Sequence, residues 1–305
     1  MTAAGKTQLA VLVGVGVVAS VLLVATVLCV AYVASTDNGR DWFMNAVIRY
    51  LRLQEQSLHN AEAVAPTPPV AALARAADAW TPDGALAAVA YVAVLHRATP
   101  LHPMWTAAPR DQRARPCACW AVLRPDGADG PPVFVALFRG TVFNNEWSIN
   151  SRANLVPWAR GPGRVHRGFA EIYARCIADV ARAHRAAGAP RVCVAGYSMG
   201  AALAQLFLVD AAPAAGAAYL FASPRVGDPA FAAAVAAVPV DARFVVNVDD
   251  PIHCLLRTRS GFQHAALPVH AFVDRADHDV DSHSLRAYWV TLLRGRLSRE
   301  PLPVA

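Results

Sequence analysis

The sequence predicts an α/β protein in which a mostly parallel central sheet carries helices on both faces, preceded by an N-terminal transmembrane helix. Three observations support this. Apolar runs rich in Val and Leu alternate with helical patterns through residues 84–294, an alternation typical of parallel strands joined by covering helices. Hydrophobic residues make up 55% of the 305 residues and charged residues only 16%, which favours one large packed domain. Residues 9–34 form an uncharged apolar run.

The N-terminal run is long enough to cross a bilayer. At about 1.5 Å per residue, a helix over residues 9–34 spans the roughly 30 Å hydrocarbon core. A cleaved signal peptide is the alternative, because Lys6 precedes the run and Val33-Ala34-Ser35 at its end offers small residues. The apolar region of a signal peptide, however, is normally only about 7–15 residues. We expect a single-pass anchor whose orientation is open. The expected organisation is a tail at 1–8, the anchor at 9–34, a juxtamembrane helix and Pro-rich linker at 35–80, the main domain at 81–296 and a tail at 297–305.

The main elements follow from periodicity and turn residues. Residues 41–60 have the apolar spacing of an amphipathic helix, and the proline-rich stretch 65–69 interrupts the chain. The apolar runs 117–123 and 133–138 lie on either side of the Pro- and Gly-rich stretch 125–132, a pattern typical of a hairpin. Beyond them, strands and helices alternate. The predicted elements are helix 84–97, strands 117–123 and 133–138, helix 165–187, strand 191–195, helix 198–211, strand 217–222, helix 228–238, strands 243–248 and 269–273, and helix 282–294.

Charge and cysteine content restrict the partners. The net charge is +6, yet the arginines are scattered, so we expect no nucleic-acid partner. The positive charge is compatible with anionic lipid headgroups. Five cysteines lie beyond the apolar run, and Cys117 and Cys119 alternate along one strand. Without a second cluster we expect no zinc site. Disulfides and oligomeric state stay open.

The pentapeptide Gly196-Tyr197-Ser198-Met199-Gly200 is the strongest chemical signal. It lies between an all-apolar strand and an apolar helix, where a sharp turn with small neighbours raises a serine hydroxyl above the sheet edge. The sequence therefore predicts the α/β-hydrolase fold with Ser198 as nucleophile. The backbone N–H of Met199 is then an oxyanion donor at a helix N-terminus.

The other members of a Ser-Asp-His triad follow the serine in the order acid, then histidine. Asp250 directly follows the strand predicted at 243–248, and Asp249 is its competitor. His283 stands immediately before the closing helix, where a general base is expected, and His278 in the same loop is the second choice.

Four further motifs accompany the pentapeptide in a fixed order. The motifs are Phe138-Arg139-Gly140-Thr141, Val165-His166-Arg167-Gly168-Phe169, residues 221–228 (FASPRVGD) and Gly261-Phe262-Gln263-His264. Together they resemble the fungal-lipase-like family, the class 3 lipases, over about residues 84–294. The resemblance implies that Thr141 is the second oxyanion donor. It also supports Asp250 and His283 as acid and base, and it makes His166 and His264 structural.

The resemblance further implies a lid between Thr141 and Val165. Phe143, Trp147 and Ile149 are suited to contact acyl chains, although a surface loop held by aromatic residues is an alternative. The family often has an acidic residue after the lid tryptophan, where this chain has Asn150 and Asn154.

The expected function is a membrane-anchored, lipase-like serine hydrolase that cleaves lipid esters through an acyl-enzyme, without metal or organic cofactor. Acylglycerols are the first expected substrates. Alternatives are a phospholipase A-type enzyme, another acyl esterase or thioesterase, and a hydrolase fold without turnover that acts as an interaction protein.

Overall fold

The computed structural model describes residues 69–97, 104–107, 116–124, 131–141, 152–254, 256, 260–273, 282–295 and 297. The chain divides into two units, 1–59 and 60–305, and every described residue belongs to the second. The expected tail, apolar run and amphipathic helix, residues 1–60, lie outside the described residues. Within the described ranges, no helix is both long and apolar enough to cross a membrane.

A seven-stranded sheet forms the centre of the second unit, in the order β1-β2-β3-β6-β7-β8-β9. The first two pairings are antiparallel and the remaining four are parallel. The mostly parallel sheet agrees with the prediction, and the six residues of β3 are all buried, as expected for a strand covered on both faces. The strands are β1 (Thr106–Ala107), β2 (Ala118–Leu123), β3 (Val133–Phe138), β6 (Arg191–Tyr197), β7 (Gly216–Phe221), β8 (Asp241–Asn247) and β9 (Val269–Phe272).

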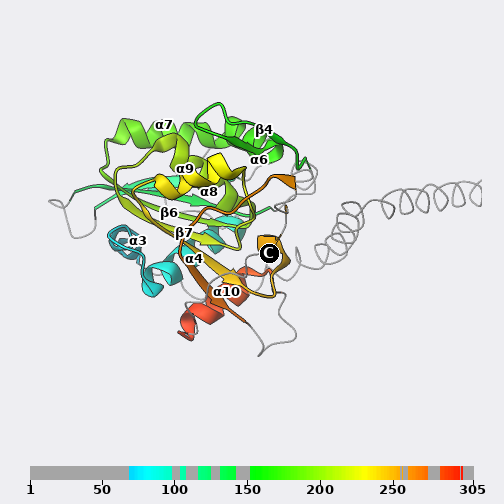
Figure 1. Ribbon diagram of the computed structural model, residues 1–305. Helices are drawn as coiled ribbons and strands as arrows, with labels where there is room; N and C mark the ends of the chain where they lie inside the picture. Colours follow the sequence, from blue (N-terminus) through cyan, green and yellow to red (C-terminus); the bar gives the residue numbers. More distant parts are fainter. Residues whose placement is uncertain are drawn as a thin grey trace, which may run out of the picture. The chain divides into compact units, whose positions relative to one another are not determined.

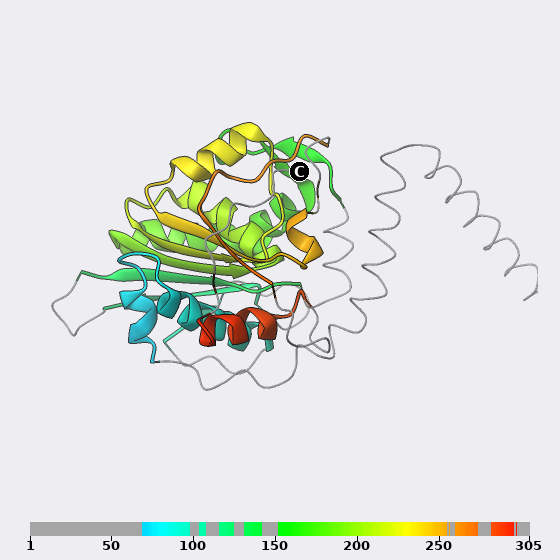
Figure 2. The ribbon, with the colours of Figure 1, turned by 60° about the horizontal axis from the view of Figure 1, so that its bottom comes forward.

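Helices cover both faces of this sheet (Figures 1 and 2). Helices α3 (Ala71–Arg75), α4 (Pro82–Arg97) and α10 (Leu285–Leu293) lie on one face. Helices α7 (Ala178–Ala187), α8 (Met199–Ala211) and α9 (Pro229–Ala237) lie on the other. Each face therefore has its own apolar core, and the arrangement agrees with the predicted mostly parallel sheet with helices on both faces.

Strand β6 shows how the sequence divides between the two cores. Val192 and Val194 belong to the core under α8, whereas Cys193, Ala195 and Tyr197 belong to the core under α4 and α10. Alternate residues of a strand point to opposite faces. Tyr197, the last residue of β6, thus lies on the α4 and α10 side.

The helix predicted over residues 165–187 begins later and is interrupted. Residues 164–166 form strand β5 (Arg164–His166), which pairs with β4 (Leu155–Pro157) in a separate two-stranded sheet. The helix begins after His166 because the imidazole of that residue accepts a hydrogen bond from the Phe169 N–H. It continues as α6 (Arg167–Ile172), a π-helical turn (Tyr173–Ile177) and α7.

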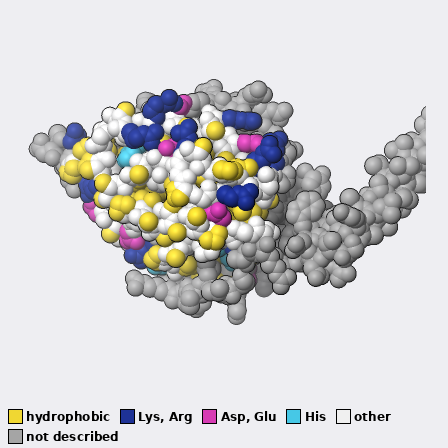
Figure 3. Space-filling view, turned by 45° about the horizontal axis from the view of Figure 1, so that its top comes forward, with side chains coloured by type: hydrophobic (Ala, Val, Ile, Leu, Met, Phe, Trp, Pro, Cys, Tyr) yellow, Lys and Arg dark blue, Asp and Glu magenta, His cyan; other side chains and the backbone are white. Residues whose placement is uncertain are grey.

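The loop between β4 and β5 is tied to the end of α8. Asp210 accepts hydrogen bonds from the Tyr173 hydroxyl at 2.7 Å and from Arg160 at 3.2 Å. Arg185 of α7 forms a further ion pair with Asp210 at 3.4 Å. Figure 3 shows several groups in which Lys or Arg side chains lie next to acidic side chains on the surface of the described residues. Exposed pairs of this kind contribute little individually.

Residues before 81, the domain boundary expected from the sequence, pack against the central sheet. Leu73 and Trp80 are buried in the core under α4 and α10, so the last part of the expected linker at 35–80 is packed. The linker was inferred from the prolines at 66–69, and the short Ala-rich helix α3 that follows carried too weak a pattern to be predicted. The Tyr219 hydroxyl of β7 donates to the Ala76 carbonyl at 2.8 Å, and Trp80 stacks on His270 of β9 at 3.9 Å.

Replacing Tyr219 with phenylalanine tests this attachment. The change leaves the Ala76 carbonyl without its buried 2.8 Å donor, and we expect the free energy of unfolding to fall by about 1–3 kcal/mol. Urea unfolding measures the loss. An unchanged unfolding midpoint would contradict the role of this hydrogen bond.

Candidate active site

Ser198 occupies a sharp turn between β6 and α8. Its backbone has φ 56° and ψ −122°, a region that costs about 1–3 kcal/mol for a residue with a side chain. The turn fits because Gly196 and Gly200 lack side chains. A Cβ on Gly196 would lie 2.3 Å from the Gly200 carbonyl oxygen, and one on Gly200 would lie 2.3 Å from the Phe138 carbonyl oxygen. The Ser198 N–H donates to the Phe221 carbonyl of β7 at 2.9 Å, which holds the turn above the sheet edge.

Asp250 follows β8 and opens a 3₁₀ turn (Pro251–Cys254). Its carboxylate is 1% exposed and accepts hydrogen bonds on both oxygens. The Ile252 N–H donates to Oδ1 at 2.9 Å, and the Tyr288 hydroxyl donates to Oδ2 at 2.7 Å. Burial and the nearby Asp250 charge raise the pKa of Tyr288 well above its ordinary value of 10. Tyr288 therefore keeps its proton and remains a donor.

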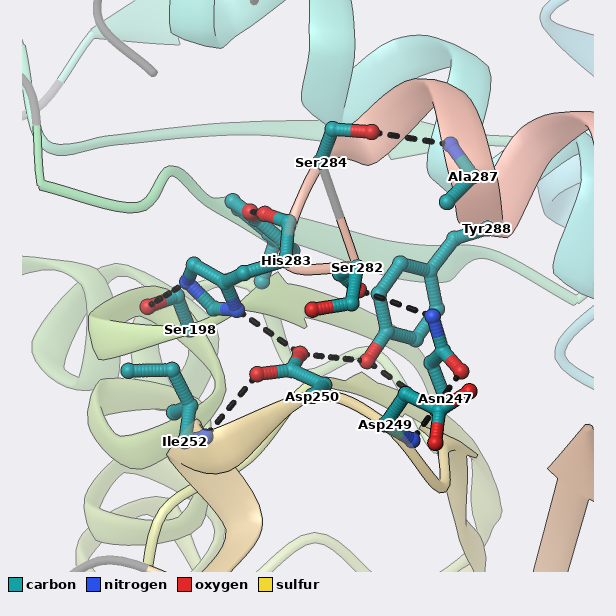
Figure 4. A network of polar contacts seen from close by, with 11 residues as sticks. Ser198, Asn247, Asp249, Asp250, Ile252, Ser282, His283, Ser284, Ala287 and Tyr288 are labelled. Carbon is teal, nitrogen blue, oxygen red and sulfur yellow. Dashed lines mark hydrogen bonds and ion pairs between the residues drawn. The ribbon is translucent and has the colours of Figure 1, made fainter. Parts of the chain in front are cut away.

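His283 joins the acid to the serine. Its Nδ1 lies 2.7 Å from Asp250 Oδ2, and its Nε2 lies 3.0 Å from Ser198 Oγ (Figure 4). With Asp250 accepting at Nδ1, the neutral imidazole presents Nε2 as an acceptor to the serine hydroxyl. The structure thus brings together Ser198, Asp250 and His283. It leaves Asp249 exposed at the surface, and His278 lies outside the described residues.

His166 and His264, the two histidines predicted to be structural, make packing and hydrogen-bond contacts, whereas the sequence assigns no role to His253. His166 caps α6 and stacks on Phe169 at 4.1 Å. The His264 imidazole hydrogen-bonds to the His253 carbonyl at 2.8 Å, and burial lowers the pKa of His264 to about 4. Burial also lowers the pKa of His253, although the adjacent Asp250 opposes that shift. Both side chains are therefore neutral near pH 7.

Thr141 and Met199 lie next to each other beside the serine. Met199 is the first residue of α8, so its N–H lies at the positive end of the helix. The Thr141 hydroxyl lies 3.6 Å from the Met199 sulfur. Arg139, 1% exposed, orders the segment before Thr141 by donating to the Pro116 carbonyl at 3.0 Å and the Gly140 carbonyl at 2.8 Å. The two predicted oxyanion donors are thus adjacent, and their roles stay predictions.

Two other sequence predictions concern this region. The expected lid residues Phe143, Trp147 and Ile149 lie outside the described residues. In the parts of the chain that the structure describes, no group of three or more His, Cys, Asp or Glu could hold a metal ion.

Sequence reasoning missed one organising residue, Asn247. This 1% exposed residue ends β8. Its carbonyl accepts from the Asp250 N–H at 2.9 Å, its side-chain amide donates to the Ser282 carbonyl at 2.9 Å, and its N–H donates to the Tyr288 hydroxyl at 3.2 Å. A polar residue directly after the apolar run Phe244-Val245-Val246 at the end of β8 was the available signal.

Replacing Gly200 with alanine tests the contact between the elbow and β3. The new Cβ would meet the carbonyl oxygens of Phe138 at 2.3 Å and Arg139 at 2.6 Å. Because the obstruction is backbone, we expect a loss of about 1–3 kcal/mol in the free energy of unfolding. We also expect slower labelling of Ser198 by a fluorophosphonate.

Gly188→Ala is the matched control. Gly188 has φ +58°, and a Cβ there meets nothing within 4 Å, so only the backbone cost of about 1–2 kcal/mol applies. Labelling should be unchanged in this variant. If Gly200→Ala behaved like Gly188→Ala in both measurements, the close approach at the elbow would not matter.

Residues 135–257 match the sequence model of the family described as lipase (class 3). The match runs from β3 to just beyond the 3₁₀ turn and contains Ser198 and Asp250. It ends before His283, whose place in the site comes from the geometry.

Among curated proteins, the chain is 28% identical over 149 residues to the chloroplastic galactolipase DONGLE of Arabidopsis thaliana, covering 38% of this chain and 32% of that protein. The chain therefore spans about a third of the length of this relative.

Similar solved structures include a Rhizomucor miehei lipase in complex with its propeptide, with 23% identity, coverage of 58% and 62% of the two chains, and a TM-score of 0.43. A triacylglycerol lipase with a serine protease triad has 26% identity, coverage of 52% and 63%, and a TM-score of 0.41. Over residues 135–257 the chain is therefore similar to the class 3 lipases.

Proposed function

We propose that the protein is a serine hydrolase that cleaves carboxylic esters of lipids through an acyl-enzyme on Ser198. The observation that carries this proposal is the continuous hydrogen-bonded path from Ser198 Oγ to His283 Nε2 at 3.0 Å and from His283 Nδ1 to Asp250 Oδ2 at 2.7 Å. All three side chains are buried, with exposures of 6%, 5% and 1%. A path of this kind at a strand-to-helix elbow is the arrangement that activates a serine hydroxyl.

The proposed reaction has two halves. His283 Nε2 takes the Ser198 proton as Oγ attacks the ester carbonyl carbon, and the carbonyl oxygen becomes an oxyanion. We assign the Met199 N–H and Thr141 as the donors to that oxyanion, and a single donor of this kind contributes about 2.7–4 kcal/mol. The imidazolium then protonates the departing alcohol, leaving the acyl group on Ser198.

In the second half, His283 takes a proton from water, and the resulting hydroxide attacks the acyl carbon. The imidazolium returns its proton to Ser198 Oγ as the carboxylic acid leaves, which restores the starting state. Asp250 remains ionised throughout and stabilises the imidazolium that forms twice in each cycle. The reaction consumes one ester and one water and requires no redox partner.

The family supports lipid esters as the substrate class. Acylglycerols are the proposed first substrates and phospholipids the second. The relative in Arabidopsis thaliana is named a galactolipase, which supports including a galactolipid among the compounds tested.

Substitutions in the triad test the mechanism. Ser198→Ala removes the nucleophile and should abolish ester hydrolysis and fluorophosphonate labelling. His283→Ala should lower the rate by on the order of 10⁴-fold or more, whereas His278→Ala should leave it near the wild-type rate. Activity that survives Ser198→Ala would exclude the acyl-enzyme, and a larger loss at His278 than at His283 would reverse the choice of base.

A substrate panel separates the alternative functions. Initial rates are compared on acylglycerol emulsions, phospholipid vesicles, galactolipid micelles, soluble chromogenic esters and thioesters, with Ser198→Ala as the blank. Hydrolysis of lipid esters above the blank supports the proposal. Activity confined to thioesters identifies another acyl hydrolase. A correctly folded protein that neither labels nor turns over any ester is the non-catalytic interaction protein.

The second part of the proposal is a membrane anchor at residues 9–34. It rests on 26 consecutive uncharged residues with Lys6 before them and arginines at 40, 49 and 52 after them. An anchor of this length would hold the hydrolase domain beside its lipid substrate. The side of the membrane on which the domain lies is open.

Introducing charged residues at the centre of the apolar run 9–34 tests the proposed anchor. We expect the unaltered chain to remain in the membrane pellet after alkaline carbonate extraction. Leu22→Arg with Leu23→Arg should move it to the supernatant, because each arginine at a helix centre costs about 2.5–3.5 kcal/mol. Leu22→Ala with Leu23→Ala is the matched control and should stay in the pellet. A soluble, shortened wild-type chain would instead establish a cleaved signal peptide.

A further inference from the structure

Tyr197, the residue before the serine in the pentapeptide, lies against the proposed general base. It is 2% exposed and ends β6 on the face covered by α4 and α10. His283 belongs to the segment that leads into α10, on that same face. The side chain of Tyr197 therefore points to the face covered by α4 and α10, where it reaches the segment that carries His283.

Tyr197 makes two kinds of contact with His283. Its hydroxyl donates a hydrogen bond to the backbone carbonyl of His283. Its ring also stacks on the imidazole, with centroids 5.0 Å apart and planes 24° apart. The first contact fixes where the backbone of the base lies, and the second limits the tilt of its ring.

The Tyr197 ring is itself held on its other sides. The edges of His96 from α4 and Tyr288 from α10 lie against it, with centroid separations of 6.0 Å and 6.1 Å. The ring fits beside residue 140 because that residue is glycine: a Cβ on Gly140 would lie 2.8 Å from Tyr197 Cδ1. Tyr197 therefore contacts both the segment before Thr141 and the segment of the base, which are far apart in sequence.

A second donor holds the adjacent peptide. The Asn247 side-chain amide donates to the Ser282 carbonyl at 2.9 Å, so two consecutive carbonyls, those of Ser282 and His283, each accept from a buried side chain at the end of a strand. Figure 4 shows Asn247 and Ser282 in the same network as the triad. The hydrogen bond between the Ser198 hydroxyl and His283 Nε2 depends on where this backbone lies.

We propose that Tyr197 is a positioning residue for the general base: its hydroxyl and ring hold His283 where Nε2 meets Ser198 Oγ. The inference rests on the proposed serine hydrolase function and concerns a residue that touches neither the ester nor the reacting atoms. A displacement of about 1 Å at a reacting group can lower a rate by about 100-fold. The loss from removing the hydroxyl should therefore appear in the rate of acylation rather than in substrate binding.

Tyr197→Phe is the test variant, because it removes the hydroxyl and keeps the ring. We expect kcat on a soluble ester and the rate of fluorophosphonate labelling to fall together by roughly 10- to 100-fold, with KM unchanged. In a crystal structure of the variant, the His283 carbonyl should move away from residue 197, and Nε2 should lie farther than 3.0 Å from Ser198 Oγ.

Tyr219→Phe is the matched control. It also removes a buried tyrosine hydroxyl from a backbone carbonyl, that of Ala76, on the same face of the sheet but away from Ser198. It should lower stability and leave kcat and labelling unchanged. If Tyr197→Phe lowered only stability, as the control does, Tyr197 would be structural and the proposal overturned.

The crystallographic comparison keeps this inference separate from the proposed function. A wild-type protein that hydrolyses no ester and is not labelled at Ser198 would refute the hydrolase. In that case an unchanged His283 position in Tyr197→Phe would still overturn the positioning role, and a displaced His283 would still support it.

Discussion

The site depends on one strained residue, Ser198, whose backbone stands at φ 56°. The conformational cost of this backbone is offset by the packing of the two elements that the turn connects. Six of the seven residues of β6 are buried, and α8 is buried along most of its length. The Ser198 N–H donates to β7 and its carbonyl accepts from the Ala201 N–H, so the peptide groups on both sides of the strained residue are satisfied. Relaxing the turn would mean separating β6, β7 and α8. The turn therefore holds the serine where its hydroxyl lies 3.0 Å from His283 Nε2.

The acid and the base come from separate parts of the sheet edge, and Asn247 connects them. Through its backbone it accepts from Asp250, and through its side chain it donates to Ser282 beside His283. Tyr288 of α10 donates to the Asp250 carboxylate and accepts from the Asn247 N–H. Packing of α10 on the sheet thus sets the separation of acid and base. A residue far from the ester can influence the reaction by moving these elements.

Sequence reasoning reached much of this structure because its strongest signals are local. Strand β3 was predicted with its observed bounds, and α8 was predicted to within one residue, because long apolar runs identify buried elements. Strands of two or three residues, such as β1, β4 and β5, have no periodicity to detect. The packing of the residues before 81 gave no signal for a related reason, since Leu73 and Trp80 are buried by partners that are distant in the sequence.

The difference between local patterns and contacts of distant residues also decides which site residues could be predicted. Chain order and the position before the last helix selected Ser198, Asp250 and His283, but only the 2.7 Å and 3.0 Å separations bring them together. Asp249 and Asp250 are adjacent and chemically identical. They differ because the backbone after β8 turns one carboxylate inward, toward Tyr288 and the Ile252 N–H. Tyr197 gave no signal in the sequence, because its partners are 86 and more than 90 residues away.

The way in which Tyr197 and Asn247 hold the base is suited to proton transfer. Both side chains donate to backbone carbonyls, those of His283 and Ser282, and neither occupies a ring nitrogen. Nδ1 remains available to Asp250 and Nε2 to Ser198, which a base needs if it is to accept and return a proton in each half of the reaction. A donor aimed at Nε2 would compete with the serine hydroxyl. A donor aimed at the carbonyl fixes the imidazole through its backbone and leaves its acid–base chemistry unchanged. The constraint on His283 is therefore geometric, and it leaves Nδ1 in its 2.7 Å contact with Asp250.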